Sequence, residues 1–381
     1  MASIYQGTAF IKGLRLGGSN DNDGGKPPKL YRGADQLWPK SVPSIINTFG
    51  GISATISQGT LEGVLTGETT TAFTLNGADI ELQTSTEFTV NDQAFFTPPF
   101  TGNPDITSVS LPQATAIGDS AFRNCSSFTT ADLPAVTSVG DYAFQNTPLN
   151  SLNLPKVTTI GDNALSFLSS LTSVNLPLVT TLNFNLCTQS SGLISFEAAI
   201  ATTAANNVLF RCTNLTTVRI PSITTTGVSC FQGCTSLATV EAPSLTAVAD
   251  SAFEECSSLT TIELPLATSI DIEAFRNCSS LTTVDMPQVT TIQRNAFQGC
   301  TSLPSIDFQL ATDISPDVFR DCTSLATINL PSATSIGASC FLNLPANGTA
   351  TFNPVFDNGA GGSTNTEIQS LIDNGWTITW V

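Results

Sequence analysis

The sequence repeats itself with a period of 22 residues over most of its length. The segment AFRNCSSL at 274–281 returns as AFQGCTSL at 296–303. The equivalent points of successive units are Pro112, Pro134, Pro155, Pro177, Ala199, Pro221, Pro243, Pro265, Pro287, Gln309, Pro331 and Asn353, with one step of 21 between Pro134 and Pro155. A period of about 20–29 residues is typical of a solenoid, in which a lone coil cannot bury its apolar edge and stacked coils can.

Each unit joins three motifs, which read L-x-x-V/I-x-L-P, V-T-T-I-G and x-x-A-F-x-x-C-S-S. The first motif predicts a short parallel strand with Leu281, Val284 and Met286 facing inward. The Ala274–Phe275 pair then fills the far side of the coil. We therefore expect a mainly β, leucine-rich-repeat solenoid of about 11–12 coils over residues 103–354.

The segments on either side of the repeats predict structures that cover the ends of the solenoid, because open ends expose apolar surface. Residues 1–40 form an N-terminal segment, and the alternating pattern of residues 41–102 predicts a small all-β domain. Residues 355–381 predict a helix–strand cap. We expect a capping box from Thr364 to Glu367, an apolar stripe of Ile368, Leu371 and Ile372, a stop at Asn374–Gly375 and a last strand in WTITWV.

The charge is unevenly distributed along the chain. The net charge is −17, yet residues 1–40 hold six basic and three acidic residues, which is +3 and leaves −20 for the rest. A strongly acidic body repels nucleic acid and anionic membrane, so we expect neither as a partner. No apolar run is long enough to span a membrane, and the first residues lack the pattern of a secretory signal.

Most of the ten cysteines fall in one column of the repeat. That column holds Cys125, Cys212, Cys234, Cys256, Cys278, Cys300 and Cys322, while Cys187, Cys230 and Cys340 replace Ala or Phe of the AF pair. Exchange with apolar residues predicts free buried thiols, with disulfides between neighbouring coils as the alternative. No zinc site is expected, since the chain has no histidine and no paired C-x-x-C.

The lack of histidine also excludes Ser-His-Asp and Cys-His catalysis. Carboxylates are abundant, but nothing selects one catalytic pair, so we expect no enzymatic activity. A glycan hydrolase that uses Glu263 and Asp285 is the enzyme alternative.

One exposed strand position is charged or polar in most coils and gives the candidate binding surface. Its members in the middle of the repeats are Glu197, Arg219, Glu241, Glu263, Asp285 and Asp307. Stacked like charges are mildly destabilising, so the position either binds a cation or a basic partner or is a hydrated face that tolerates repulsion. Calcium is the only cofactor left open. Flanking hydroxyls such as Thr260 and Thr282 suit glycans.

The segment LTTVDMPQVTTIQRNAFQGCTSL resembles the BspA-like leucine-rich repeats of bacterial and protist surface proteins and of some viral proteins. The resemblance covers about residues 105–354. It implies adhesion and ligand binding, here to a host-surface protein or glycan.

The N-terminal segment resembles modules of phage structural proteins. The matching residues include Tyr5, Tyr31, Arg32 and Trp38, which the resemblance makes docking residues for other virion proteins. It implies a virion location, as a tail-tip or tail-fibre adhesin or as a capsid decoration protein. The sequence leaves open whether the chain forms a homo-oligomer. An extracellular bacterial surface adhesin is the alternative, and an ordinary hairpin would give the same short pattern.

Overall fold

The computed structural model describes residues 115–381, with residues 101, 102, 104 and 107–110 before them. Eight short strands precede these residues, of which only the backbone is described. They are β1 (Tyr5–Gln6), β2 (Ala9–Phe10), β3 (Leu14–Leu16), β4 (Leu30–Arg32), β5 (Asp35–Gln36), β6 (Ile56–Ser57), β7 (Thr60–Leu61) and β8 (Ile80–Glu81). The chain forms two compact units, residues 1–171 and 172–381, and each is described by itself.

The first unit builds each coil from two short parallel strands. Its first strands are β9 (Ser108–Ser110), β11 (Thr130–Asp132) and β13 (Ser151–Asn153), and its second strands are β10 (Ala116–Ile117), β12 (Ser138–Val139) and β14 (Thr159–Ile160). Strand β8 pairs in parallel with β9, so the same sheet reaches back into residues 56–81.

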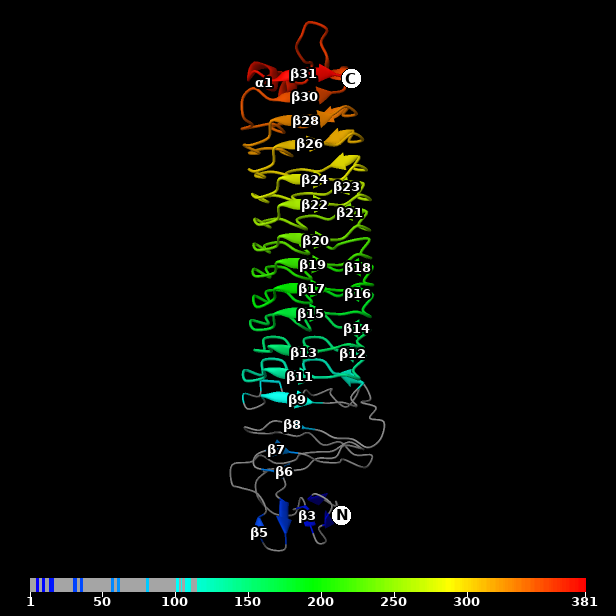
Figure 1. Ribbon diagram of the computed structural model, residues 1–381, viewed down its shortest axis with the longest axis vertical. Coiled ribbons are helices and arrows are strands. Elements are labelled where there is room, and N and C mark those ends of the chain that lie inside the picture. Colours follow the sequence, from blue (N-terminus) through cyan, green and yellow to red (C-terminus); the bar gives the residue numbers. More distant parts are fainter. Residues whose placement is uncertain are drawn as a thin grey trace, which may run out of the picture. The chain divides into compact units, whose positions relative to one another are not determined.

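The second unit is built from the same kind of two-strand coil (Figure 1). Its first strands are β15 (Ser173–Asn175), β17 (Ser195–Glu197), β19 (Thr217–Arg219), β20 (Thr239–Glu241), β22 (Thr261–Glu263), β24 (Thr283–Asp285), β26 (Ser305–Asp307), β28 (Thr327–Leu330) and β30 (Thr349–Phe352). Its second strands are β16 (Thr181–Leu182), β18 (Thr203–Ala204), β21 (Ala247–Val248), β23 (Ser269–Ile270), β25 (Thr291–Ile292), β27 (Asp313–Ile314) and β29 (Ser335–Ile336). Residues 22 apart pair across these strands, so the predicted β solenoid is confirmed.

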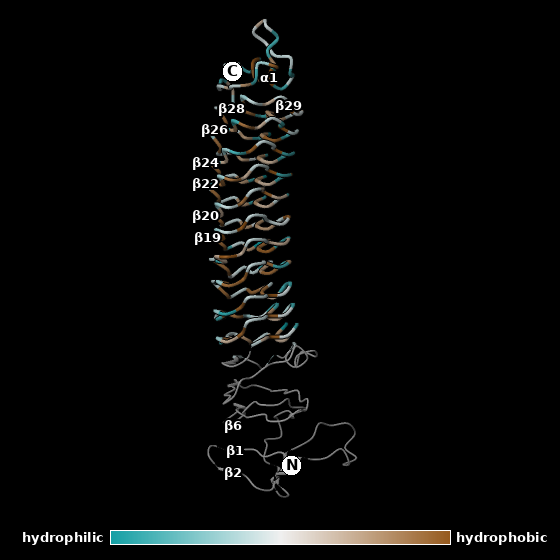
Figure 2. The backbone as a smooth tube through the Cα atoms, turned by 90° about the vertical axis from the view of Figure 1, so that its right-hand side faces the viewer, coloured by the Kyte–Doolittle hydropathy of each residue, from teal (hydrophilic) through white to brown (hydrophobic). Residues whose placement is uncertain are grey.

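The core of the second unit is a stack of phenylalanine rings. Phe231, Phe253, Phe275 and Phe297 follow one another at centroid distances of 5.0, 5.3 and 5.2 Å, with nearly parallel planes. Leu281 and Met286 are buried and Val284 is half-buried, as the inward pattern predicts. Apolar and polar segments alternate within each of these coils (Figure 2). Burial of a phenyl ring contributes about 1.5–3 kcal/mol, so the stack is a main source of stability.

Two residues of each coil take a left-handed backbone where the chain turns around the AF pair. In one coil they are Asn295 (φ 58°) and Gly299 (φ 73°). Asparagine, aspartate, serine and glycine fill most of these positions because they tolerate a positive φ best. A Cβ on Gly299 would lie 2.5 Å from Oδ1 of Asn277, a side-chain end that can move aside, so the positive φ is the feature that favours glycine here.

All ten cysteines are buried and free, which confirms the prediction of buried thiols. Several thiols donate to a carbonyl oxygen 25 residues earlier, such as Cys256 Sγ to Phe231 O at 3.2 Å and Cys278 Sγ to Phe253 O at 3.1 Å. The column therefore adds weak hydrogen bonds between successive coils. Burial raises the pKa of Cys212 to about 12.

The C-terminal cap contains a short 3₁₀ helix at Pro354–Phe356, the helix α1 (Thr366–Asp373) and the strand β31 (Thr377–Trp380), which pairs in parallel with β30. The predicted capping box at Thr364 is wrong. Asn365 caps α1 and accepts hydrogen bonds from the backbone N–H groups of Glu367 and Ile368. Asparagine is among the best N-cap residues, and here its amide also donates to Ile336 O at 3.3 Å.

The end of α1 agrees with the sequence. Asn374 is the C-cap and Gly375 has φ 84°, as predicted. Ile368 and Leu371 are buried and Ile372 is half-buried. Trp376 is buried, and its Nε1 donates to Pro345 O at 2.8 Å. No helix in the described residues is long and apolar enough to cross a membrane.

The buried thiols predict a loss of stability at alkaline pH. An unfolded thiol ionises near pH 8.5, whereas burial raises the pKa of Cys212 to about 12. The contribution of the Cys212 thiol to the free energy of unfolding is therefore complete below about pH 8.5 and is lost as the pH rises towards 12. We expect Cys212→Ala to make the fall of the unfolding free energy between these values less steep by about 1.4 kcal/mol per pH unit.

Urea unfolding at a series of pH values, under reducing conditions, measures this slope. Thr213→Ala is the matched control, because its exposed side chain does not titrate in this range. Equal slopes for Cys212→Ala and the unsubstituted chain would contradict the prediction.

Candidate functional site

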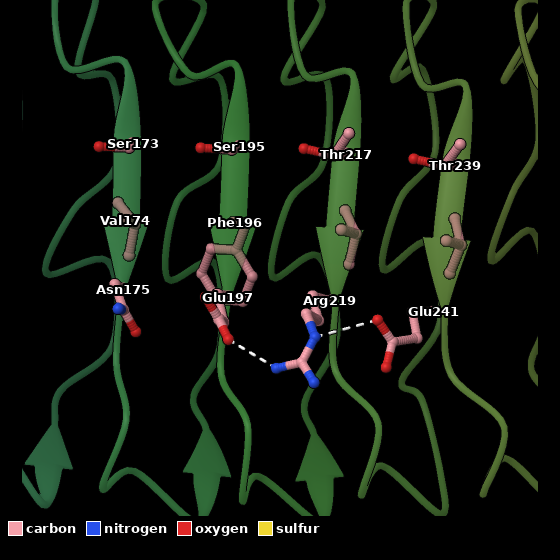
Figure 3. Close-up of a pocket in the computed structure, with 12 residues that line it drawn as sticks. Ser173, Val174, Asn175, Ser195, Phe196, Glu197, Thr217, Arg219, Thr239 and Glu241 are labelled. Atoms are coloured by element: carbon pink, nitrogen blue, oxygen red, sulfur yellow. Dashed lines mark hydrogen bonds and ion pairs between the residues drawn. The ribbon is translucent and has the colours of Figure 1, made fainter.

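A shallow hollow lies over the four-stranded sheet β15–β17–β19–β20, with a volume of about 580 Å³. The same three positions of each strand line it: Ser173, Val174, Asn175, Ser195, Phe196, Glu197, Thr217, Val218, Arg219, Thr239, Val240 and Glu241 (Figure 3). The strands pair in parallel and in register, so chemically similar positions form rows across the sheet. Neighbouring strands in such a sheet are about 4.8 Å apart.

Two polar rows run across this hollow. One consists of the hydroxyls of Ser173, Ser195, Thr217 and Thr239, and the other of Asn175, Glu197, Arg219 and Glu241. Between the rows lie Val174, Phe196, Val218 and Val240, of which the first three are buried. Because alternate residues of a strand face opposite sides, a row of apolar anchors separates two rows of polar groups.

Arg219 joins the two carboxylates beside it. Its Nη1 lies 2.7 Å from Glu197 Oε1, and its Nε lies 3.0 Å from Glu241 Oε2. The third nitrogen, Nη2, makes neither bond (Figure 3). The hydrogen bond to Glu197 is the main cause that raises the pKa of Arg219, with the charge of Glu241 next. The carboxylates of Glu197 and Glu241 thus fix the orientation of the Arg219 guanidinium.

The triplet Glu197–Arg219–Glu241 lies at the surface. The three side chains are 40%, 49% and 50% exposed. Exposed ion pairs add little to folding stability. The two ion pairs therefore add little to the stability of the coil, and their main effect is to fix the orientation of the Arg219 side chain.

The remaining members of the predicted surface lie on other sheets. Glu263 pairs with Asp285 across β22 and β24. Asp307 in β26 pairs with Asn329, whose amide donates to Asp307 Oδ1 at 2.9 Å, and Gln309 Nε2 donates to the same oxygen at 2.7 Å. The structure thus divides the predicted row into an ion triplet, a carboxylate pair and an amide-bound carboxylate.

Sequence reasoning expected flanking hydroxyls, such as Thr260 and Thr282, but did not identify the row in the four coils of the hollow. The signal was present, because a serine or threonine stands two residues before the charged position in each of these four coils.

Sequence reasoning also missed a group of ion pairs formed by the residues around the AF pairs. Arg276 bridges Glu254 at 3.3 Å and Glu273 at 3.2 Å, and Asp317 contacts both Arg294 and Arg320 at 3.4 Å. Desolvation raises the pKa of Glu254. The Arg276–Glu254 and Arg294–Asp317 pairs link successive coils, the other two pairs lie within one coil, and all four lie outside the hollow.

The predicted docking residues fall largely outside the described residues. Tyr5 is in β1 and Tyr31 and Arg32 are in β4, where only the backbone is described, and Trp38 is not described. Their docking role stays a prediction.

Comparison with protein families and solved structures identifies the repeats. The model of the family described as "BspA type Leucine rich repeat region" matches residues 97–206, 202–309 and 246–355, which is more than half of the chain. The chain belongs to the BspA-type leucine-rich repeat family. The predicted resemblance is confirmed for the repeats, while the resemblance of the N-terminal segment to phage modules finds no support. A search of curated proteins finds no significant match.

A solved leucine-rich repeat protein shares the fold. A leucine-rich repeat protein from Bacteroides ovatus is 23% identical, with a TM-score of 0.50 over 88% of this chain and 99% of its own. A leucine-rich cell surface protein from Faecalibacterium prausnitzii is 22% identical, with a TM-score of 0.43 over 80% of this chain and 93% of its own. At 23% identity the likeness to the Bacteroides protein concerns the fold alone.

The acidic positions predict no stabilisation by calcium. Glu263 and Asp285 face each other across β22 and β24, and two carboxylates supply fewer than the six to eight oxygen ligands that calcium takes. We expect the midpoint of thermal unfolding to be the same in millimolar calcium and in chelator. A rise with calcium that Glu263→Gln or Asp285→Asn abolishes would contradict this expectation.

Proposed function

We propose that the chain is a non-enzymatic, adhesin-like binding protein whose partner docks on the hollow over β15–β20. The observation that carries the proposal is the Glu197–Arg219–Glu241 triplet, a half-exposed arginine held in place on a rigid sheet. Arginine is enriched among residues that dominate binding energy, and a preoriented side chain loses less entropy when a partner binds. Adhesion and ligand binding are also what the BspA-type repeat implies.

A protein is the favoured partner. Exposed aliphatic side chains stand close to the hollow in the sequence: Ile194 directly before β17, Ile200 three residues after it, and Leu178 three residues after β15. They are 47%, 44% and 43% exposed. Apolar contacts around an arginine are typical of protein interfaces. The hydroxyl row favours a glycan, which is the second candidate.

The proposed surface predicts that Arg219→Gln weakens binding without unfolding the chain. The variant removes the cation and leaves Glu197 and Glu241 without their shared partner, so we expect at least a roughly tenfold loss of affinity. Arg294→Gln is the matched control, since Arg294 is 64% exposed and pairs with Asp317 outside the hollow. Thermal unfolding should be nearly unchanged in both variants.

Immobilised panels of extracellular proteins and of purified glycans measure the binding. Binding to the protein panel that Arg219→Gln weakens and Arg294→Gln retains supports the proposal, and the same pattern on the glycan panel alone supports the second candidate. Equal effects of both substitutions, or no binding of the unsubstituted chain to either panel, would contradict the assignment of this surface.

For the place of display, we propose a virion, with residues 1–40 as the docking segment and a bacterial cell surface as the alternative. The proposal is supported by the charge of +3 on residues 1–40 against −20 on the rest. We expect the full chain to copurify with phage particles and a chain without residues 1–40 to remain free. Recovery of the full chain in the cell-envelope fraction of uninfected cells would favour the alternative.

A further inference from the structure

The loop between the 3₁₀ helix and α1 holds an Asn–Gly pair in an ordered turn. Asp357 and Ser363 form an antiparallel bridge, and Asn358–Gly359 lies in the exposed stretch between them. In an Asn–Gly pair the glycine N–H is unshielded by a side chain, so its nitrogen can approach the side-chain carbonyl of the asparagine. The described residues contain two other such pairs, Asn347–Gly348 and Asn374–Gly375.

The side-chain carbonyl of Asn358 lies in a pocket of two backbone donors. Its Oδ1 accepts from Ala360 N at 2.9 Å and from Gly362 N at 3.0 Å. Two N–H groups aimed at one carbonyl oxygen polarise the carbonyl and stabilise the negative charge that develops on the oxygen during nucleophilic attack. Asn358 Cγ is therefore activated as an electrophile.

The nitrogen that would attack this carbon is also bound to a suitable group. Gly359 N donates to Asp357 Oδ1 at 2.8 Å. A carboxylate can take the amide proton as the nitrogen attacks, which a backbone carbonyl cannot do. The loop thus brings together a base (the Asp357 carboxylate), a nucleophile (Gly359 N) and an electrophile (Asn358 Cγ). Two backbone N–H groups complete it as an oxyanion site.

The other two Asn–Gly pairs lack this arrangement. Gly375 N donates to the backbone carbonyl of Ile372 at 3.0 Å, at the end of α1. Gly348 is buried, and a Cβ there would lie 2.5 Å from the ring of Trp376, so Asn347 has little room to rearrange. The three pairs therefore share a sequence and differ in environment.

We propose that Asn358–Gly359 is a self-modification site that deamidates through a succinimide. Gly359 N attacks Asn358 Cγ, its proton passes to Asp357, and the charge on Oδ1 is held by the N–H groups of Ala360 and Gly362. The Cγ–Nδ2 bond then breaks, and the amide leaves as ammonia with the proton that Asp357 returns. Water opens the succinimide at Cγ to give aspartate, or at the main-chain carbonyl to give isoaspartate.

The product changes the contacts of the C-terminal cap. Isoaspartate adds one carbon to the backbone between Asp357 and Gly359, which disrupts the hydrogen bonds from Ala360 and Gly362. The adjoining Ser363 donates to Gln369 Oε1 at 2.9 Å, and its hydroxyl accepts from Asn365 N at 3.0 Å. Modification at 358 is thereby transmitted to the N-cap of α1.

Mass spectrometry of the full chain tests this proposal with internal controls. No lysine or arginine follows Arg320, so one tryptic peptide holds all three Asn–Gly pairs, and fragment ions locate the conversion of amide to acid. After incubation near neutral pH, we expect Asn358 to convert at least roughly tenfold faster than Asn347 and Asn374. In urea, where the loop is lost, the three rates should converge.

The variant Asp357→Ala tests the proposed base. We expect it to slow conversion of Asn358 roughly tenfold in the folded chain while the other two sites keep their rates. Asp357 is exposed, and circular dichroism checks that the variant is folded. Conversion of Asn358 no faster than the other two sites, or at an unchanged rate in Asp357→Ala, would overturn the proposal.

Discussion

The structure depends on the backbone hydrogen bonds that each coil makes with the next. The bonds recur with the period of the sequence, as in Phe253 N to Ala274 O at 2.8 Å and Phe275 N to Ala296 O at 2.8 Å. These bonds form only if each coil brings the chain back into register with the preceding coil. The left-handed residues around the AF pair make the turns that do so. One coil, between Pro134 and Pro155, is a residue shorter and still pairs in register, whereas a larger change of length would misalign the strands, phenyl rings and thiols that follow it.

The candidate surface follows from this constraint. Fixed register places each exposed residue about 4.8 Å from its equivalent in the next coil, so one substitution per coil is enough to build a row. A single arginine at a position otherwise held mostly by acids and asparagines, Arg219, then contacts the carboxylates on both sides. The proposed binding surface is accordingly encoded by departures from the consensus, while the consensus itself maintains the core.

The sequence predicts the core and the strand order because both follow from periodicity. The inward positions, the buried cysteines and the final strand all agree with the pattern. The cap residue was missed because STNTE offers four successive candidates, and only tertiary contacts such as Asn365 Nδ2 to Ile336 O distinguish them. The sequence places Glu197, Arg219 and Glu241 side by side, but it does not predict their ion pairs. Side-chain torsions decide whether Arg219 reaches both neighbours. The loop of Asn358 depends on backbone turns that no repeat specifies.

Deletion of one full period tests the central account most directly. Removal of residues 265–286 joins Leu264 to Pro287 and preserves the register, so that Phe253 can stack on Phe297. The account predicts cooperative urea unfolding and a native-like circular dichroism spectrum for this chain, whereas removal of the half-period 265–275 abolishes both. Equal disruption by the two deletions, or equal tolerance of them, would contradict a fold that depends on coil-to-coil register.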